Sequence, residues 1–233
     1  RFYAFWLPFL FPTEDNLLKF CHSQKVKDEV NKWCNAIETE NLGIHNAGSR
    51  QISNSKKEIK TPDDLIGMNI RVPGANVFIS LYRTYFGANP TAMDFSEVYT
   101  SLQQGAIDGQ ENPIAVYASS KFDEVQKYVT LWDGVRDTTI WIMSSATLES
   151  LTDEEERIVR ESADKALQWA NDYLAESEGQ IIADLKKKGV IFTELTEEEK
   201  NAFKEKCQGI YAEFEPSIGK DVIELFTKGY LED

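Results

Sequence analysis

Cysteine, histidine and long apolar runs are scarce in this sequence of 233 residues, and each scarcity excludes a class of protein. The three cysteines, at positions 21, 34 and 207, are odd in number and lack the spacing of metal ligands, so we expect buried free thiols. His22 and His45 are the two histidines, and they suggest no metal centre. No apolar run approaches the roughly 18 residues of a membrane span.

Positive charge is also in short supply. Lys and Arg number 25 against 39 Asp and Glu, which gives a formal net charge of −14. A chain this acidic does not bind nucleic acid by neutralising phosphates, and an anionic membrane would repel it. The deficit is uneven: residues 1–145 hold 14 basic and 17 acidic side chains, whereas residues 146–233 hold 11 and 22. The first part is near neutral and leaves room for a local positive site.

The chain opens on the aromatic run RFYAFWLPFLF, without an initiator methionine. This run lacks the basic start and the small-residue cleavage site of a signal peptide. Its composition favours a strand with partners on both sides. We therefore expect that sequence upstream of Arg1 is missing.

Short apolar strands alternate with helical segments along the first 145 residues. The expected strands are 43–50, 68–72, 106–109, 129–131 and 138–143, and the expected helices are 13–34, 61–65, 75–86 and 95–105. This alternation is typical of an α/β fold with largely parallel sheets.

The last third is mostly helical. Thr152 and Glu155 have the spacing of a capping box, and an apolar stripe continues from there to Leu185, before Gly189. An unbroken helix of this length spans about 50 Å, which favours a strut lying across two lobes. A strand at 190–192 and two helices, 197–214 and 217–229, complete the expected elements.

Sequence motifs for catalysis are few. The glycine-rich nucleotide fingerprints, a nucleophile elbow and HExxH are absent, so we expect no organic cofactor and no metal. Glu97 and Glu111 could form an acid/base pair, as in a glycosidase. A carboxylate-dependent glycoside hydrolase on an α/β scaffold is therefore the alternative function.

Two arginines and an amide follow successive predicted strands. Arg50 closes the strand before it, Arg71 lies in NIRVP, and Asn112 precedes Pro113. Ligands of open α/β sheets bind at the carboxyl ends of strands, and a guanidinium matches a carboxylate with two parallel hydrogen bonds. Three such residues together favour a carboxylate-binding site over separate ion pairs.

Several sequence stretches resemble one family throughout the chain. They are LPFLF at 7–11, GSRQ at 48–51, PDDLIGMNIRVP at 62–73, GANPT at 87–91, FSEVY at 95–99, SLQQGAIDGQENP at 101–113 and FDEVQKY at 122–128. The sequence resembles the DctP-type solute-binding proteins of the tripartite ATP-independent periplasmic (TRAP) transporters.

The resemblance implies a two-lobed binding protein that closes over a small organic acid, such as a uronate or another monocarboxylate, and delivers it to a membrane permease without catalysis. By position, Arg71 clamps the carboxylate, Arg50 and Asn112 support it, and Phe95 packs against the ligand. Two further residues are candidate hydroxyl partners: Glu97 and Gln51.

The sequence departs from the family pattern in two places. Family members carry a further N-terminal segment of lobe one, so that part of the lobe is expected to be missing here. Where many members have Thr-x-His, this chain reads WDGVRD from Trp132. A sugar ring could stack on Trp132 or Trp141, with Asp133 or Asp137 accepting sugar hydroxyls; equally, both tryptophans could be core residues.

The family pattern also implies an organisation and a location. Lobe one is expected to hold residues 1–47 and 138–180, and lobe two with the C-terminal helices to hold 48–137 and 181–233. The expected partners are the TRAP permease subunits and a small carboxylate, with no nucleic acid, and the protein is expected to be a monomer. The expected location is the periplasm, or the outer face of the membrane as a lipoprotein.

Overall fold

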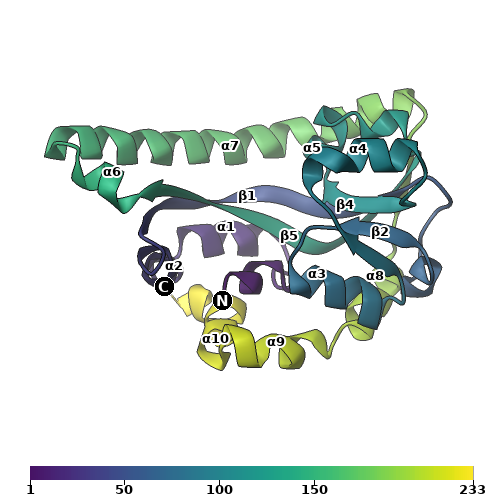
Figure 1. Cartoon of the computed structure of the whole chain (residues 1–233), viewed down its shortest axis with the longest axis horizontal. Coiled ribbons are helices and arrows are strands. Elements are labelled where there is room, and N and C mark those ends of the chain that lie inside the picture. The colour runs from purple at the N-terminus through teal and green to yellow at the C-terminus, as the bar shows by residue number, and fades with distance from the viewer. Residues whose placement is uncertain (233) are drawn as a thin grey trace.

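One six-stranded sheet runs through both lobes of this α/β protein, as the computed structural model of residues 1–232 shows (Figure 1). The strand order is β3-β2-β4-β1-β5-β6. The strands are β1 (Thr39–Asn54), β2 (Asn69–Val72), β3 (Asn89–Ala92), β4 (Gly109–Pro113), β5 (Tyr128–Ser144) and β6 (Ile191–Glu194). Strand β2 is parallel to β3 and β4, and β5 is parallel to β6, but β1 is antiparallel to β4 and β5. The sheet is therefore mixed rather than largely parallel.

Ten α-helices surround the sheet in the part of the chain that the structure describes. They are α1 (Glu14–His22), α2 (Gln24–Asn35), α3 (Asn76–Ser80), α4 (Phe95–Gln103), α5 (Ile114–Ser119), α6 (Ser145–Glu149), α7 (Asp153–Lys187), α8 (Glu197–Lys206), α9 (Ile210–Ile218) and α10 (Lys220–Thr227). Short 3₁₀ turns lie at Phe2–Trp6, Pro62–Leu65, Phe122–Glu124 and Gly229–Glu232, and a π-helical turn, Leu81–Tyr85, extends α3. None of these helices is long and apolar enough to cross a membrane.

The long helix α7 confirms the expected strut. It has 35 residues and runs across both lobes (Figure 1). Thr152 and Glu155 form the capping box, and Lys186 and Lys187 lie in the last turn, where cations suit the helix dipole. Helix α7 packs closely on β1, because a Cβ at Gly43 would lie 2.2 Å from Leu167 Cδ1.

Strands β1 and β5 are much longer than the sequence pattern predicts. The segments 43–50, 129–131 and 138–143 belong to two antiparallel strands of 16 and 17 residues, which pair along most of their length. Bulges interrupt the pairing at three places, including the step from Arg50 to Ile52. These bulges disturb the alternation of apolar residues and so hide the continuity of the strands.

The opening aromatic run is not a strand. Residues Phe2–Trp6 form a 3₁₀ turn, with Ala4 N–H donating to Arg1 O at 2.9 Å. The ring of Phe5 packs edge-on against Phe20, Trp33 and Phe226. Burial of these aromatic rings, rather than a strand ladder, fixes the segment.

Two predicted helices are broken in the structure. Ser23 leaves the helical conformation between α1 and α2, and its hydroxyl caps α2 by accepting from Val26 N–H at 3.3 Å. The predicted helix 197–214 likewise divides between α8 and α9, and α10 begins only after Gly219, whose φ is 103°. Serine favours helix N-caps, so the break at Ser23 follows from residue type. Glycine favours the backbone conformation of Gly219, which accounts for the separate start of α10. The break between α8 and α9 lies at residues 207–209.

Two hydrophobic clusters hold the elements together. The larger joins the N-terminal segment, α1–α3 and the C-terminal helices, with Phe20, Phe78, Trp132 and Phe226 almost fully buried. The smaller lies under α4, α5 and the end of α7. Cys21, Cys34 and Cys207 are buried free thiols, as expected.

We predict that Gly134→Ala destabilises the protein, because the new Cβ would lie 2.1 Å from the buried ring of Trp132. Overpacking of this kind costs about 1–3 kcal/mol of unfolding free energy, measurable by urea denaturation. The matched control is Gly179→Ala in α7, where a Cβ meets no atom within 4 Å. That change should stabilise the helix by about 0.5–1 kcal/mol. A Gly134→Ala protein as stable as the wild type would contradict the close packing.

Candidate functional site

Three neighbouring strands bring together the two arginines and the amide that the sequence predicts for the site. Arg71 on β2 is paired with Gln110 on β4, and Asn112 on β4 is paired with Gln51 on β1, next to Arg50. Arg50 Nη2 donates to Asn112 Oδ1 at 3.2 Å. Arg50 does not end its strand, because β1 continues to Asn54.

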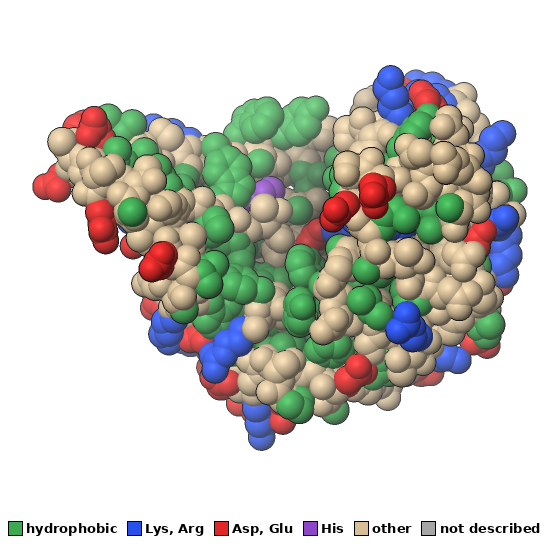
Figure 2. Space-filling view, viewed as in Figure 1, with side chains coloured by type: hydrophobic (Ala, Val, Ile, Leu, Met, Phe, Trp, Pro, Cys, Tyr) green, Lys and Arg blue, Asp and Glu red, His purple; other side chains and the backbone are tan. Residues whose placement is uncertain are grey.

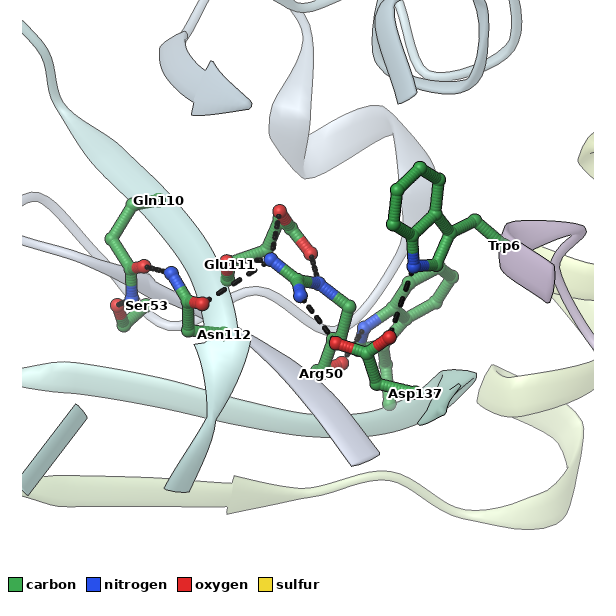
Figure 3. A network of polar contacts seen from close by, with 8 residues as sticks. Trp6, Arg50, Ser53, Gln110, Glu111, Asn112 and Asp137 are labelled. Atoms are coloured by element: carbon green, nitrogen blue, oxygen red, sulfur yellow. Dashed lines mark hydrogen bonds and ion pairs between the residues drawn. The ribbon is translucent and has the colours of Figure 1, made fainter. Parts of the chain in front are cut away.

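Arg50 is enclosed by negative charge from this protein itself (Figure 3). Its guanidinium forms a two-pronged ion pair with Glu111, in which Nε and Nη2 donate to the two carboxylate oxygens. Nη1 donates to Asp137 Oδ2 at 2.6 Å, and the guanidinium lies 5.2 Å from the centre of the Phe78 ring. Arg50 is 8% exposed and Glu111 is 1% exposed, so two carboxylates surround this one buried cation.

Burial and ion pairing have opposing effects on these groups. Burial alone would lower the pKa of Arg50, but the charges of Glu111 and Asp137 and their hydrogen bonds raise it above its usual value. Burial raises the pKa of Glu111, and the Arg50 charge and hydrogen bonds limit that rise. No sequence pattern indicates Glu111 as the partner of Arg50, because the Arg50–Pro113 register that places them together is a property of the sheet.

Asp137 has both carboxylate oxygens engaged within the protein. Oδ2 accepts from Arg50, and Oδ1 accepts from the indole Nε1 of Trp6 at 2.9 Å. The ring of Trp6 also packs against Phe78 at 5.6 Å between centroids. Asp137 thus serves as an internal counter-ion in this structure.

Arg71 differs from Arg50 because no carboxylate pairs with it among residues 1–232. Its Nε and Nη2 both donate to Met93 O, at 3.0 and 2.7 Å. The guanidinium lies 5.7 Å from the centre of the Phe95 ring, which is 45% exposed. One side of the guanidinium is therefore fixed by the backbone, and the end formed by Nη1 and Nη2 keeps hydrogens for a ligand.

The positive charge of Arg71 is only partly offset by neighbouring negative charges. Burial lowers the pKa of Arg71; Glu111 and Asp94 raise it, and the Arg50 charge lowers it. A guanidinium nevertheless stays protonated in proteins. Arg71 thus presents a buried positive charge whose Nη1 has no hydrogen-bond partner among residues 1–232.

Gln51 supports a bulge of the sheet. Between the pairs Arg50–Val135 and Ile52–Thr130, residues 131–134 of β5 do not pair with β1. Gln51 Oε1 accepts from the N–H groups of Trp132 and Asp133 at 2.9 and 3.3 Å, and Nε2 donates to Asp133 Oδ1 at 2.7 Å. Its amide replaces missing backbone partners, so Gln51 has a structural role here.

The two candidate tryptophans have different environments. Trp132 is 1% exposed and packs against Phe9, Phe86 and Phe203, while its Nε1 donates to Arg50 O at 2.7 Å. It is a core residue, and no ring face remains for a sugar. Trp141 on β5 is 37% exposed.

The candidate acid/base pair is not assembled as such. Glu97 is exposed in the first turn of α4, whereas Glu111 is buried and bound to Arg50. A glycosidase needs one carboxylate that can be protonated and a second that faces the same sugar. An internal ion pair on Glu111 does not provide that arrangement.

A recess lies beside the Arg50 network. Figure 2 shows this face hollowed between the two lobes, with apolar side chains along much of the hollow. One cavity of about 380 Å³ is lined by Phe2, Phe5, Trp6, Asp137, Thr138, Thr139 and Ile140. No group of three or more His, Cys, Asp or Glu side chains among residues 1–232 could hold a metal ion.

The fold matches that of known periplasmic binding proteins. A TRAP periplasmic solute-binding protein from Sulfitobacter sp. NAS-14.1, with bound β-D-galacturonate, superimposes with a TM-score of 0.91 at 28% identity, over 97% of this chain and 74% of that one. A TRAP periplasmic solute-binding protein from Shewanella oneidensis, with bound succinate, gives 0.92 at 27% identity, over 99% and 75%. The two-lobed architecture is that of a solute-binding protein.

Sequence comparison defines the family. Residues 1–217 match the model of DctP, the bacterial extracellular solute-binding proteins of family 7, and this chain belongs to that family. A solute-binding protein from Verminephrobacter eiseniae is 36% identical over 177 residues, which are 76% of this chain and 52% of the relative. The chain spans about half the length of the first curated relatives it matches. The expected family is confirmed.

We predict that Arg50→Ala strongly destabilises the fold, because Glu111 and Asp137 would remain buried without their cation. Loss of one partner of a buried ion pair typically costs about 3–5 kcal/mol, which urea denaturation at pH 7 would measure. Removing Arg50 also removes the charge and the hydrogen bonds that do most to lower the pKa of Glu111. Glu111 of the folded variant then binds a proton more readily than Glu111 of the unfolded chain. The loss of unfolding free energy relative to the wild type should therefore shrink as the pH falls from 7 to 5.

The control for this prediction is Arg157→Ala, which removes an exposed arginine paired with Glu154 and Glu161. Exposed ion pairs contribute little to stability, because water and salt screen the two charges. Equal losses in the two variants would contradict the assignment of Arg50 as a buried, doubly paired cation.

Proposed function

We propose that this chain is the binding component of a TRAP transporter: it captures a small organic acid outside the cytoplasm and delivers it to the membrane permease. The observation that carries the proposal is Arg71, a buried guanidinium that pairs with no carboxylate among residues 1–232 and has Phe95 beside it. Family membership and the two-lobed fold agree with this role.

The charges favour a monocarboxylate, such as a sugar acid or uronate. Arg50 and Arg71 contribute two positive charges, and Glu111 and Asp137 contribute two negative ones, so the centre is neutral when empty. One ligand carboxylate on Arg71 uses the one unpaired cation, and a second carboxylate would find none within this group. Asn112 supports the ligand from β4, and Phe95 packs on it; Glu97 and Trp141 remain candidates for its distal end.

Binding without catalysis is the proposed activity. The alternative glycoside hydrolase needs Glu97 and Glu111 to face one substrate, and the ion pair between Glu111 and Arg50 opposes that role. The relatives that match the chain by family and fold are solute-binding proteins.

The remaining parts of the proposal concern organisation. The periplasmic relatives favour an extracytoplasmic location, with attachment as a lipoprotein and a monomeric state as finer proposals. The proposed lobe boundaries near residues 47 and 137 coincide with the bulge where Asn46–Thr138 pairing passes to Gly48–Asp137.

We predict that Arg71→Ala weakens ligand binding by about 10- to 150-fold, since a hydrogen bond to a charged group contributes about 1.5–3 kcal/mol. Calorimetric titration with D-galacturonate, D-glucuronate and succinate would measure this, and the two uronates should bind more tightly than succinate. Arg83→Ala, which removes an exposed arginine on the π-helical turn, should leave affinity unchanged. Unaltered affinity of Arg71→Ala for a bound uronate would reject this site, and turnover of a glycoside would reject the non-catalytic role.

A further inference from the structure

A line of five side chains joins Arg50 to Gln126 through hydrogen bonds (Figure 3 shows its first four). Arg50 Nη2 donates to Asn112 Oδ1 at 3.2 Å, and Asn112 Nδ2 donates to Gln110 Oε1 at 2.5 Å. Gln110 Nε2 donates to Ser53 Oγ, and Ser53 Oγ donates to Gln126 Oε1, both at 2.6 Å. The line connects β4 and β1 with the segment that precedes β5.

The direction of every hydrogen bond in this line is fixed at its two ends. The guanidinium of Arg50 can only donate, so the oxygen of the Asn112 amide must face it. At the other end, Gln126 Nε2 donates at 3.2 Å to the Ser53 carbonyl, which can only accept. Its Oε1 therefore faces the Ser53 hydroxyl. Reversing any amide between these ends would oppose two donors or two acceptors.

Burial makes this order costly to break. Gln110 is 0% exposed, Ser53 and Gln126 are 1% exposed, and Asn112 is 6% exposed. Because water has little access, a donor that loses its acceptor here pays the full desolvation cost. The side chains of the line therefore act together: loss of the Ser53 hydroxyl removes the acceptor of Gln110, and a change in Gln110 alters the partner of Asn112.

The order decides what Asn112 can offer to a ligand. Its oxygen accepts from Arg50, and one Nδ2 hydrogen goes to Gln110. The other Nδ2 hydrogen has no partner in the described chain, so Asn112 presents a donor. A donor suits the oxygen of a carboxylate or a hydroxyl group, whereas a reversed amide would present a lone pair to the same oxygen.

We propose that Ser53 is a positioning residue for ligand binding, which acts through Gln110 to keep the Asn112 amide oriented as a donor. Ser53 is connected to Asn112 through Gln110, to whose Nε2 its hydroxyl oxygen is hydrogen-bonded, and Ser53 is buried from solvent. The inference rests on the proposed carboxylate site and adds to it a residue outside the family motifs that indicated Arg50, Arg71 and Asn112.

The test is a double-mutant cycle on the full chain, with calorimetric titration of D-galacturonate, D-glucuronate and succinate. Ser53→Ala should weaken the tightest of these acids by about 5- to 10-fold, as expected for one impaired hydrogen bond. In an Asn112→Ala background the same change should alter affinity by less than about twofold, because non-additivity marks residues that act as one network. Ser53→Thr keeps the hydroxyl and should restore affinity.

Each outcome decides the matter. Equal effects of Ser53→Ala with and without Asn112 would show a merely structural role and overturn the positioning proposal while leaving the carboxylate site in place. If the wild-type chain binds none of the acids, the proposed function fails and the role of Ser53 fails with it. Should Ser53→Ala not fold, Ser53→Cys carries the same cycle, since a thiol is a weak donor and acceptor of similar size.

Discussion

The buried charge of Arg50 is the constraint on which the centre of this protein depends. A guanidinium removed from water must be paired, and here Glu111 from β4 and Asp137 from β5 pair with it while it stands on β1. Three strands are therefore held by two ion pairs that share one guanidinium, and Trp6 and Trp132 add hydrogen bonds from the N-terminal segment and the core. The sheet could not keep this register with an uncompensated cation inside it.

The same constraint separates two residues of one type. Arg50 and Arg71 lie on strands that both border β4, yet the first is neutralised by the protein and the second is not. Placement of the carboxylates, rather than placement of the arginines, decides which guanidinium remains for a ligand. The net charge of a chain is a poor guide to such a site. A chain with a net charge of −14 can still hold an unpaired arginine where no acidic side chain lies next to it.

Sequence patterns predict the parts of this structure that depend on local chemistry. The capping box at Thr152, the length of α7 and the strand around Arg71 follow from residue type and spacing. The continuity of β1 and β5 does not, because bulges interrupt the alternation and the pairing is set by partners far along the chain. The family motifs locate Arg50, Arg71 and Asn112. Contacts within the protein engage Gln51, Trp132 and Asp137, and these contacts depend on how distant parts of the chain pair in the sheet.

The continuous strands β1 and β5 also have a mechanical meaning. Together with α7 they connect the lobes as a ribbon and a rod, without a loose linker between them (Figure 1). Any relative movement of the lobes must then bend the hydrogen-bonded pair of strands β1 and β5. A bent pair of strands favours a return to its unbent form once the force that displaced the lobes is removed. One of the three bulges in this ribbon lies between Arg50 and Ile52, so an irregularity of the strand pairing adjoins the central ion pair.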